Sequence, residues 1–403
     1  MAYDVCIVGA GPVGGALACQ LAASGLSVAV TDRAALPPME HPDFDGRAYA
    51  IAAGSRRLLV EAGLWDALPL PAGPIEQIRV SDGAVGRPAS KLHLHFDVAD
   101  VNEPGGALGW MVEARSLRVA INTCLDALPN VDVFAPADAT VTRGAEAAAI
   151  KLSTGESFTA RLVIAAEGRD SPLRRQAGIT VQRWPYHQSG IVCAIAHERP
   201  HDQTALEHFL PAGPFAQLPM APTDEEPNLS AIVWSERTAD APRYMALDDE
   251  AFGYEISRRL GSHLGAIRPV GRRWVYPLSA MYVHRIVADR LALVGDAAHG
   301  IHPIAGQGLN LGLRDAIALG DLLIAAHAAN EDVGAPALLN RYQRARRVDV
   351  ISMLIATDGL DRLFSTNFPP IRLARDLGIA AVHRLPRLKR AFMRQAMGLA
   401  LGG

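Results

Sequence analysis

Two glycine-rich segments, far apart in the chain, contain the residues best suited to chemistry. The first is Gly9-Ala10-Gly11-Pro12-Val13-Gly14, a G-x-G-x-x-G motif that directly follows an apolar run. The second covers 295–310, where Gly295-Asp296 ends a strand-like run and Gly306-Gln307-Gly308-Leu309-Asn310 opens a helical pattern. A helix start has free backbone N–H groups and a partial positive charge. Both segments are therefore predicted to hold electron-rich groups.

The first segment and the acid that follows it predict a dinucleotide site. Gly9 permits a tight turn, Gly11 lets the backbone approach a pyrophosphate, and Gly14 permits close helix–strand packing. Pro12 opens the helix whose N-terminus would hold the pyrophosphate. Asp32 ends the second strand, where a carboxylate can bind ribose hydroxyls, and Arg33 is a candidate phosphate partner.

The second segment indicates which dinucleotide is bound. Asp296 is placed to accept a hydrogen bond from a ribityl hydroxyl, and the helix start would face the pyrimidine side of a reduced flavin. The predicted contacts are Gly295, Asp296, Gly306, Gln307, Gly308, Leu309 and Asn310. The alternative for Asp296 is a plain helix N-cap. His299 and His302 have the spacing of metal ligands but lack carboxylate-rich surroundings, so we expect no metal.

Composition narrows the class of protein. The 403 residues are 49% hydrophobic and 20% charged, with a formal net charge of -3, which argues against nucleic acid as the main partner. No apolar run reaches the roughly 18 residues of a membrane span. The N-terminus does not resemble a signal peptide, and four scattered cysteines indicate neither a disulfide framework nor a zinc site. We therefore expect a cytoplasmic protein.

The pattern of elements predicts a discontinuous architecture. Residues 3–31 form a strand–helix–strand unit, 47–64 and 111–128 are helical, and 131–166 contain several strands. Residues 75–98 alternate like strands, and recurrent prolines mark a mostly antiparallel region over 181–280. The predicted domains are a dinucleotide-binding domain (1–75, 100–180 and 281–345), a substrate domain (76–99 and 181–280) and a C-terminal helical region (346–403).

These motifs together resemble one family, the flavoprotein aromatic hydroxylases of the para-hydroxybenzoate hydroxylase type, and within it the ubiquinone-biosynthesis subgroup. Besides both glycine segments, the resemblance rests on 44–51, the Glu113/Arg115 pair, 162–174 and 356–360. It implies an α/β fold: a Rossmann-like FAD-binding domain of the GR2 type, with an inserted antiparallel-sheet substrate domain and a C-terminal helical region.

The resemblance also implies roles for particular residues. Arg47 and Arg115 would contact FAD, and Pro303, with His299 and Gly306, would form the surroundings of the flavin ring. Glu167 stands where the family usually has Asp, and its longer side chain is expected to bind the cofactor by reaching a ribose through water. The substitution weakens any inference about pyridine-nucleotide binding. No general base is assigned in the middle region.

The implied activity is hydroxylation of a polyprenylated phenol or quinone precursor of ubiquinone. FAD is the expected cofactor, O2 the co-substrate, and NAD(P)H or a reductase the electron donor, since no second G-x-G-x-x-G follows a strand. The alternatives are a prenyl reductase or halogenase on the same scaffold, or a non-catalytic flavin-binding assembly protein.

The C-terminal stretch 371–401 is apolar and basic. Its cations are Arg372, Arg375, Arg384, Arg387, Lys389, Arg390 and Arg394. Such a segment can lie on the inner face of an anionic membrane or dock a biosynthetic partner. Either contact would help to deliver a hydrophobic substrate, and the alternative is a solvated basic face.

Overall fold

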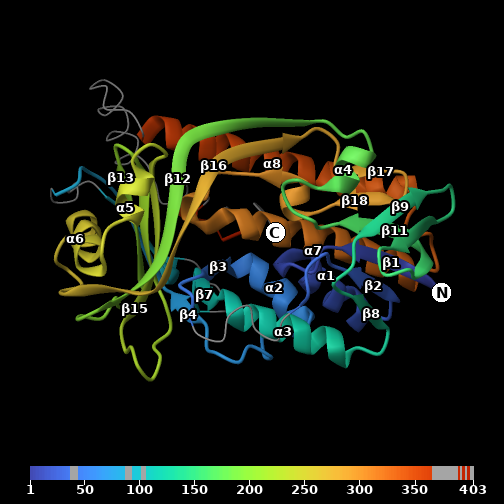
Figure 1. Ribbon diagram of the computed structural model, residues 1–403, viewed down its shortest axis with the longest axis horizontal. Coiled ribbons are helices and arrows are strands. Elements are labelled where there is room, and N and C mark those ends of the chain that lie inside the picture. The colour runs from blue at the N-terminus through green and yellow to red at the C-terminus, as the bar shows by residue number, and fades with distance from the viewer. Residues whose placement is uncertain are drawn as a thin grey trace.

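The computed structural model describes residues 1–36, 44–86, 93–100, 106–364, 389–390, 393–394 and 397–399. Figure 1 shows two bodies, one in which helices cover a sheet and one built around an antiparallel sheet, joined by two long strands. This arrangement confirms the expected fold class.

The first body is built on an eight-stranded sheet with the order β17-β18-β11-β1-β2-β8, extended by β10 and β9 beyond β11. Its central strands are parallel and almost wholly buried, as expected when both faces of a parallel sheet are covered. The strands are β1 (Ala2–Val8), β2 (Val28–Thr31), β8 (Val131–Phe134), β9 (Ala139–Arg143), β10 (Ala148–Leu152), β11 (Ser157–Ala165), β17 (Val287–Ala288) and β18 (Leu291–Leu293).

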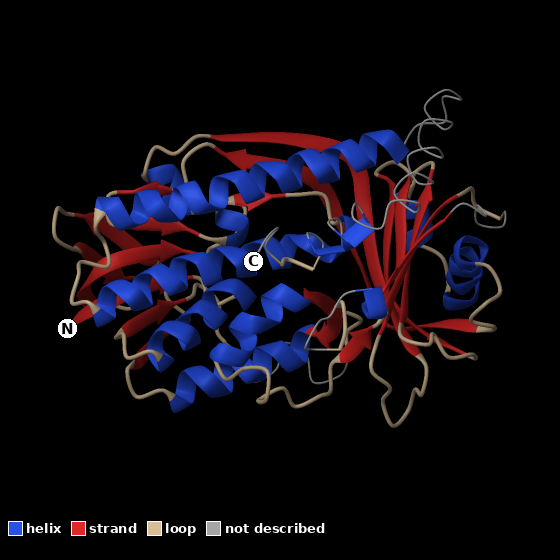
Figure 2. Ribbon diagram, turned by 180° about the vertical axis from the view of Figure 1, so that it is seen from behind, coloured by secondary structure: helices blue, strands red, loops and turns tan. Residues whose placement is uncertain are grey.

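Helices pack on this sheet and on one another. Helix α1 packs against both α3 and α7, and α7 packs against α8, so that one layer of helices is visible from behind the molecule (Figure 2). The helices are α1 (Pro12–Ala23), α2 (Ala53–Glu61), α3 (Ala114–Ala127), α4 (Pro172–Gln176), α7 (Gln307–Ala328) and α8 (Pro336–Phe364).

A small antiparallel sheet lies between the two bodies and corrects two predictions. It consists of β3 (Ala48–Ala52), β7 (Gly109–Glu113) and β4 (Gly73–Ile75), in the order β3-β7-β4. The helix predicted over 47–64 is therefore wrong in its first part, and the helix predicted from 111 begins only at Ala114. Alanine favours helices in isolation, but pairing with β7 overrides that weak preference.

The second body is an antiparallel sheet with one parallel pair, β5–β13, in the order β19-β16-β12-β15-β14-β13-β5-β6. Its strands are β5 (Gln77–Asp82), β6 (His93–Asp97), β12 (Val181–His197), β13 (Thr204–Leu210), β14 (Gly213–Pro219), β15 (Leu229–Arg237), β16 (Ile267–Val283) and β19 (His299–Gly300). Strands from 77–97 and from 181–283 thus share one sheet. A 3-10 turn, η1 (Val98–Asp100), follows β6.

The two faces of this sheet have different partners. On the outer face, a core around Trp234 and Phe252 includes side chains of α5 (Ala241–Met245) and α6 (Asp249–Leu260). On the inner face, Ala205 and Leu218 belong to a cluster that contains Met111 of β7. The inner face is therefore turned toward the first body.

Strands β12 and β16 physically connect the two bodies. They pair over most of their length, with register shifts at two irregularities, and they cross from one body to the other along the top of Figure 1. Near its end, β16 pairs with β19, where Met281 faces Gly300 and Tyr282 faces His299. Part of the second glycine segment, β19, is thus an edge strand of the sheet formed by the second body.

The basic C-terminal prediction falls mainly outside the described residues. Residues 371–388 are not among them, whereas Lys389 is, and its Nζ lies 2.6 Å from Asp100 Oδ2. Among the described helices, none is long and apolar enough to cross a membrane.

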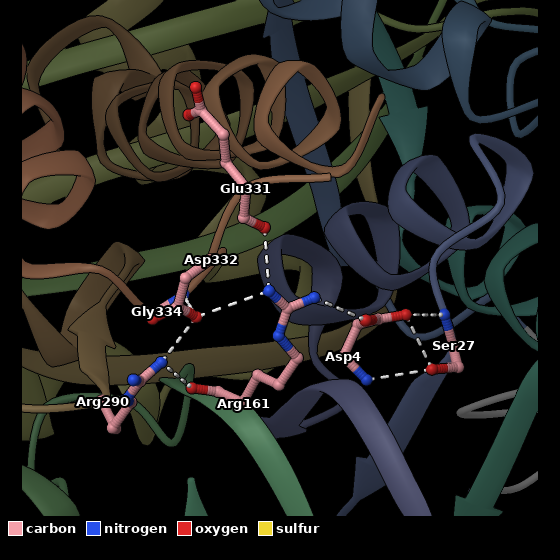
Figure 3. A network of polar contacts seen from close by, with 7 residues as sticks. All are labelled: Asp4, Ser27, Arg161, Arg290, Glu331, Asp332 and Gly334. Atoms are coloured by element: carbon pink, nitrogen blue, oxygen red, sulfur yellow. Dashed lines mark hydrogen bonds and ion pairs between the residues drawn. The ribbon is translucent and has the colours of Figure 1, made fainter. Parts of the chain in front are cut away.

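A polar network ties the edge of the first body together (Figure 3). Arg161 on β11 reaches Asp4 of β1 and donates to the Glu331 carbonyl at 2.8 Å in the α7–α8 connection. Arg290, which is mostly buried, donates to Asp332 at 2.7 Å and twice to the Ala145 carbonyl. The network links five segments that are far apart in the sequence, namely β1, the β9–β10 turn, β11, the β17–β18 turn and the α7–α8 connection.

Arg290→Ala should lower the free energy of unfolding by about 2–3 kcal/mol, because it removes several charged hydrogen bonds from a buried position. Arg161→Ala, at the more exposed member of the network, should cost only about 1 kcal/mol or less. Urea unfolding of both variants measures the difference. An Arg161→Ala penalty equal to or larger than that of Arg290→Ala contradicts this account.

Candidate functional site

The first glycine segment forms a tight turn between β1 and α1. Gly9 has φ = 110°, and its N–H donates to the Thr31 carbonyl at 2.7 Å. A Cβ on Gly14 would lie 2.0 Å from the Gly9 carbonyl oxygen, so the turn requires glycine there. A Cβ on Gly11 would meet no atom of the described chain within 4 Å, and no described side chain caps α1. The start of α1 therefore faces open space with free N–H donors.

Asp32 lies beside this turn. Its Oδ2 accepts from the Ala10 N–H at 2.8 Å and its Oδ1 from the Ala34 N–H at 2.9 Å. Each oxygen has a further lone pair for a ligand hydroxyl. Arg33 next to it is exposed. The structure thus gives Asp32 a structural function in holding the turn, which the sequence did not indicate.

Arg118 also contacts the first glycine segment, although the sequence did not indicate it. It lies on α3, and its Nη1 donates to the Ala10 carbonyl at 2.7 Å. The available signal was its position three residues after Arg115, which places both on one face of a helix.

Arg47 and Arg115 lie at one end of the β3–β7 pair, where the Ala114 N–H donates to the Arg47 carbonyl. Each guanidinium is oriented by a nearby acid: Arg47 Nε donates to Asp45 Oδ2 at 2.8 Å, and Arg115 Nε to Glu113 Oε2 at 2.6 Å. Arg47 also lies over the Trp274 ring. The structure brings these two predicted cofactor contacts together.

Glu167 has a local structural role. Its carboxylate accepts from the Ser171 hydroxyl and from the Leu173 N–H, at the start of α4. Burial raises the pKa of this carboxyl. Binding of a cofactor ribose by Glu167 through a water molecule stays a prediction.

The second glycine segment is irregular before its helix begins. After β18 it forms a 3-10 turn, η2 (Gly295–Ala297), then β19, then a second turn, η3 (Ile304–Gly306), and only then α7. Asp296 is solvent-accessible, yet the surrounding protein raises the pKa of its carboxyl by desolvation. Asp296 is thus accessible although protein closely surrounds it, and we call the open space in front of it the recess.

The start of α7 borders this recess as well. Gly306 has φ = 63° and precedes α7, and a Cβ on Gly308 would meet no described atom within 4 Å. The two helix starts lie close together, because Val13 of α1 is the side chain that a Cβ on Gly295 or on Gly312 would meet. The recess therefore has two helix N-termini at its edge.

Asn310 uses its side chain to hold the fold. Its Oδ1 accepts from the Ala52 N–H at 2.8 Å, and its Nδ2 donates to the carbonyls of Ala50 at 2.7 Å and Gly306 at 3.0 Å. It thereby connects β3 to the start of α7. Contact of its backbone with a flavin ring stays a prediction.

A buried carboxylate anchors the second segment from behind. Asp315 of α7 accepts from the Gly295 N–H at 2.9 Å, contacts His299 Nε2 at 2.6 Å and accepts from Arg346 Nε of α8 at 2.6 Å. Burial alone would raise the pKa of Asp315, but His299 and Arg346 lower it. His299, which the resemblance places in the ring environment, is thus bound to this anchor. Asp315 and Arg346 were missed in the sequence.

His302 holds the same segment from the other side. Its Nε2 lies 2.9 Å from Gln188 Oε1 on β12 and 3.6 Å from Asp361 Oδ1 on α8, and its ring packs edge-on against Tyr186. Burial lowers the pKa of His302. Pro303 follows directly and is half-buried, so its position is fixed by a buried neighbour.

The described residues contain no group of three or more His, Cys, Asp or Glu side chains arranged to hold a metal ion. The recess does fit the predicted FAD. It offers free N–H donors at two helix starts, open space at Gly11 and Gly308, and an accessible acid at Asp296.

Comparisons with known proteins agree with this geometry. A family model described as an FAD binding domain matches residues 2–355. Ubiquinone hydroxylase UbiL of Rhodospirillum rubrum is 49% identical over 401 residues, which cover 99% of this chain and 90% of that protein. The 3-demethoxyubiquinol 3-hydroxylase of Escherichia coli is 35% identical over 98% of each chain. In fold, the chain resembles p-nitrophenol 4-monooxygenase PnpA of Pseudomonas putida, with a TM-score of 0.78, 18% identity and 98% of each chain covered.

Gly11→Ala and Gly14→Ala should separate cofactor binding from folding. The methyl group of Gly11→Ala enters open space, so the cofactor-free protein should lose no more than about 1 kcal/mol, the cost of Ala at an N-cap, while FAD binding weakens at least about tenfold. Gly14→Ala should destabilise the fold itself, because its methyl group overlaps the Gly9 carbonyl. FAD titration and urea unfolding measure both effects. Unchanged FAD affinity in Gly11→Ala contradicts the placement.

Asp315→Asn should lower the free energy of unfolding by about 3 kcal/mol or more, because it removes the more deeply buried of the two carboxylates that pair with Arg346 and leaves Asp349 as its remaining charged partner. Since the folded pKa of Asp315 is lowered, the penalty should be constant at neutral pH and shrink only below the ordinary carboxyl value of 3.8. Asp321→Asn, on the same helix but exposed, is the control and should stay within about 0.5 kcal/mol. A loss below about 1 kcal/mol in Asp315→Asn refutes the anchor.

Proposed function

The chain belongs to the FAD binding domain family, and from this premise we propose that it is a flavin-dependent monooxygenase that hydroxylates the aromatic ring of a ubiquinone precursor. The observation that carries the proposal is that relatives named as hydroxylases of ubiquinone or demethoxyubiquinol match nearly the whole chain. The match therefore includes both glycine segments and the antiparallel sheet. This favours hydroxylation over a prenyl reductase, a halogenase or a non-catalytic assembly protein.

FAD, when bound, supplies the two-electron chemistry that activates O2. The chain would hold it with the backbone at Gly11, with Asp32 and Asp296 toward its hydroxyls, and with Arg47 and Arg115 at the far end of the recess. The free N–H groups at the start of α7 favour negative charge on a reduced ring. NAD(P)H or a reductase delivers the electrons.

The sheet of the second body supplies the opposite wall. Phe209 of β13 and Ile304 of η3 are buried in one cluster, with Val80, Leu94 and Leu363 packed against it. These side chains are apolar, so the wall can exclude water from the reacting ring. An apolar wall also suits the prenyl tail of the proposed substrate.

The basic stretch 371–401 stays a proposal. We propose that it lies on an anionic membrane surface or on a partner protein and so helps to deliver the substrate, which would place the protein at the inner face of the membrane. The charge of the segment supports this proposal.

The decisive test of function is oxygen incorporation. FAD-loaded protein, supplied with NAD(P)H or a chemical reductant and isotopically labelled O2, should add one labelled oxygen atom to a prenylated phenol, as read by mass spectrometry. Protein without FAD is the control. Flavin oxidation that yields only hydrogen peroxide with every prenylated phenol contradicts the proposal. Complementation of strains blocked at each ring hydroxylation identifies the ring carbon.

A further inference from the structure

A single carboxyl group interrupts the apolar wall of the second body. Side chains alternate along a strand, so Ala205, Glu207 and Phe209 of β13 share one face of the sheet. Ala205 belongs to the cluster that contains Met111 of β7, and Phe209 packs with Ile304 of η3. Glu207 therefore lies between two residues that face the first body and its second glycine segment.

The neighbouring strands confirm this direction. By register, Glu207 is flanked by Val80 on β5 and by Ala216 on β14. Val80 belongs to the Phe209 cluster and Ala216 to the Ala205 cluster. The next residue, His208, faces the opposite side, where its Nδ1 lies 2.7 Å from Ser81 Oγ.

Glu207 is buried without a partner. The residue is 7% exposed, and no hydrogen bond or ion pair joins its side chain to the described part of the chain. A buried carboxyl without a hydrogen-bond partner is costly, so its retention points to a ligand that supplies one. The surrounding face is not closed, because the apolar side chains Ile78, Val80 and Leu94 are only half-buried.

The groups facing Glu207 are almost all apolar. On β14 they are Pro214, Ala216 and Leu218, on β6 Leu94 and Phe96, on η3 Ile304, and on α8 Leu363. Among the described residues of these strands, Asp82 on β5 is a titratable residue on the same face, and in the strand register it lies beside Phe209. Burial alone raises the pKa of Glu207 to about 7. This value suits a group that must accept and release a proton near neutral pH.

We propose that Glu207 is the catalytic base for the substrate, accepting first the hydrogen bond and then the proton of the ring hydroxyl. The proposal rests on the proposed function. The substrate O–H bond breaks, its electron pair stays on the phenolic oxygen, and an O–H bond forms on Glu207. The ring carbon that gains oxygen from O2 then loses its hydrogen as a proton to solvent, and Glu207 returns its own proton to the phenolic oxygen. The two electrons that break the O–O bond come from the reduced cofactor, and the second oxygen atom of O2 takes up two protons and leaves as water.

Binding tests the hydrogen bond without turnover. FAD-loaded protein should bind a prenylated phenol at least about tenfold more tightly than its O-methyl ether, because the ether leaves the buried carboxyl unpaired. Glu207→Gln, which retains an acceptor oxygen, should keep a preference for the phenol, whereas Glu207→Leu should lose it. Equal discrimination in Glu207→Leu and the unsubstituted protein overturns the proposal.

Kinetics test the proton transfer. Glu207→Gln should lower kcat for hydroxylation on the order of 10²-fold or more with little change in KM, and the lost product should be replaced by hydrogen peroxide. The kcat of the unsubstituted enzyme should rise through pH 7 as Glu207 loses its proton, and Glu207→Gln should lack that rise. An unchanged pH profile and product yield in Glu207→Gln overturn the assignment.

A matched control separates catalysis from folding. Glu236 is equally buried in the neighbouring sheet region, but on the outer face, where its Oε2 contacts Trp234 and Arg259. Glu236→Gln should lower stability and leave the pH profile unmoved. By contrast, Glu207→Gln should raise the thermal unfolding midpoint when it is measured at pH values above 7. There the substitution removes an unpaired buried charge.

Failure of the proposed function and failure of Glu207 as the base give different results. Suppose that the unsubstituted protein prefers phenols over their O-methyl ethers, that Glu207→Leu loses this preference, and that no phenol is ever hydroxylated. The proposed function is then wrong, and the contact of Glu207 with the phenol stands. If it hydroxylates prenylated phenols and Glu207→Gln does so equally well, the function stands and Glu207 is not the base.

Discussion

The structure depends above all on one buried carboxylate, Asp315. It joins the Gly295 N–H and the His299 ring, both in the second glycine segment, to the Arg346 guanidinium of α8. A buried charge is tolerated only when it is paired and hydrogen-bonded, and here the bonds to Gly295 and His299 also fix part of the second glycine segment. The irregular backbone from η2 to η3 can therefore keep one shape without being part of a long helix or strand.

The same segment is also held by the second body. Strand β19 adds it to the edge of the second sheet, and His302 is clamped between Gln188 of β12 and Asp361 of α8. The loop thus belongs to both bodies, and the sheet that presents the apolar wall is positioned by direct contact with the segment predicted to face the flavin ring. This explains how segments far apart in sequence can build one site.

Much of this site could be predicted from the sequence, because tight turns and close backbone contacts require glycine at fixed positions. The spacing of these glycines and of the acids near them is visible in the sequence. A positive φ requires glycine at Gly9 and Gly306, and close contact with the Gly9 carbonyl requires it at Gly14. The anchor Asp315 could not be predicted, since an acid within a helix usually faces solvent and its partners come from distant segments. The strand at Ala48–Ala52 was missed because pairing with β7 overrides alanine's helix preference. Glu207 became interpretable only when the sheet register showed which face it occupies.

The central claim is that the recess between the two helix starts holds the flavin with its ring between the Gly306–Asn310 backbone and the apolar sheet wall. The most direct test is an experimental structure of the protein with FAD and a prenylated phenol bound. The account predicts the ring against the start of α7, the pyrophosphate at Gly11, and the phenol hydroxyl within hydrogen-bond distance of Glu207. A flavin ring away from α7, or a phenol bound with its hydroxyl remote from β13, would contradict it.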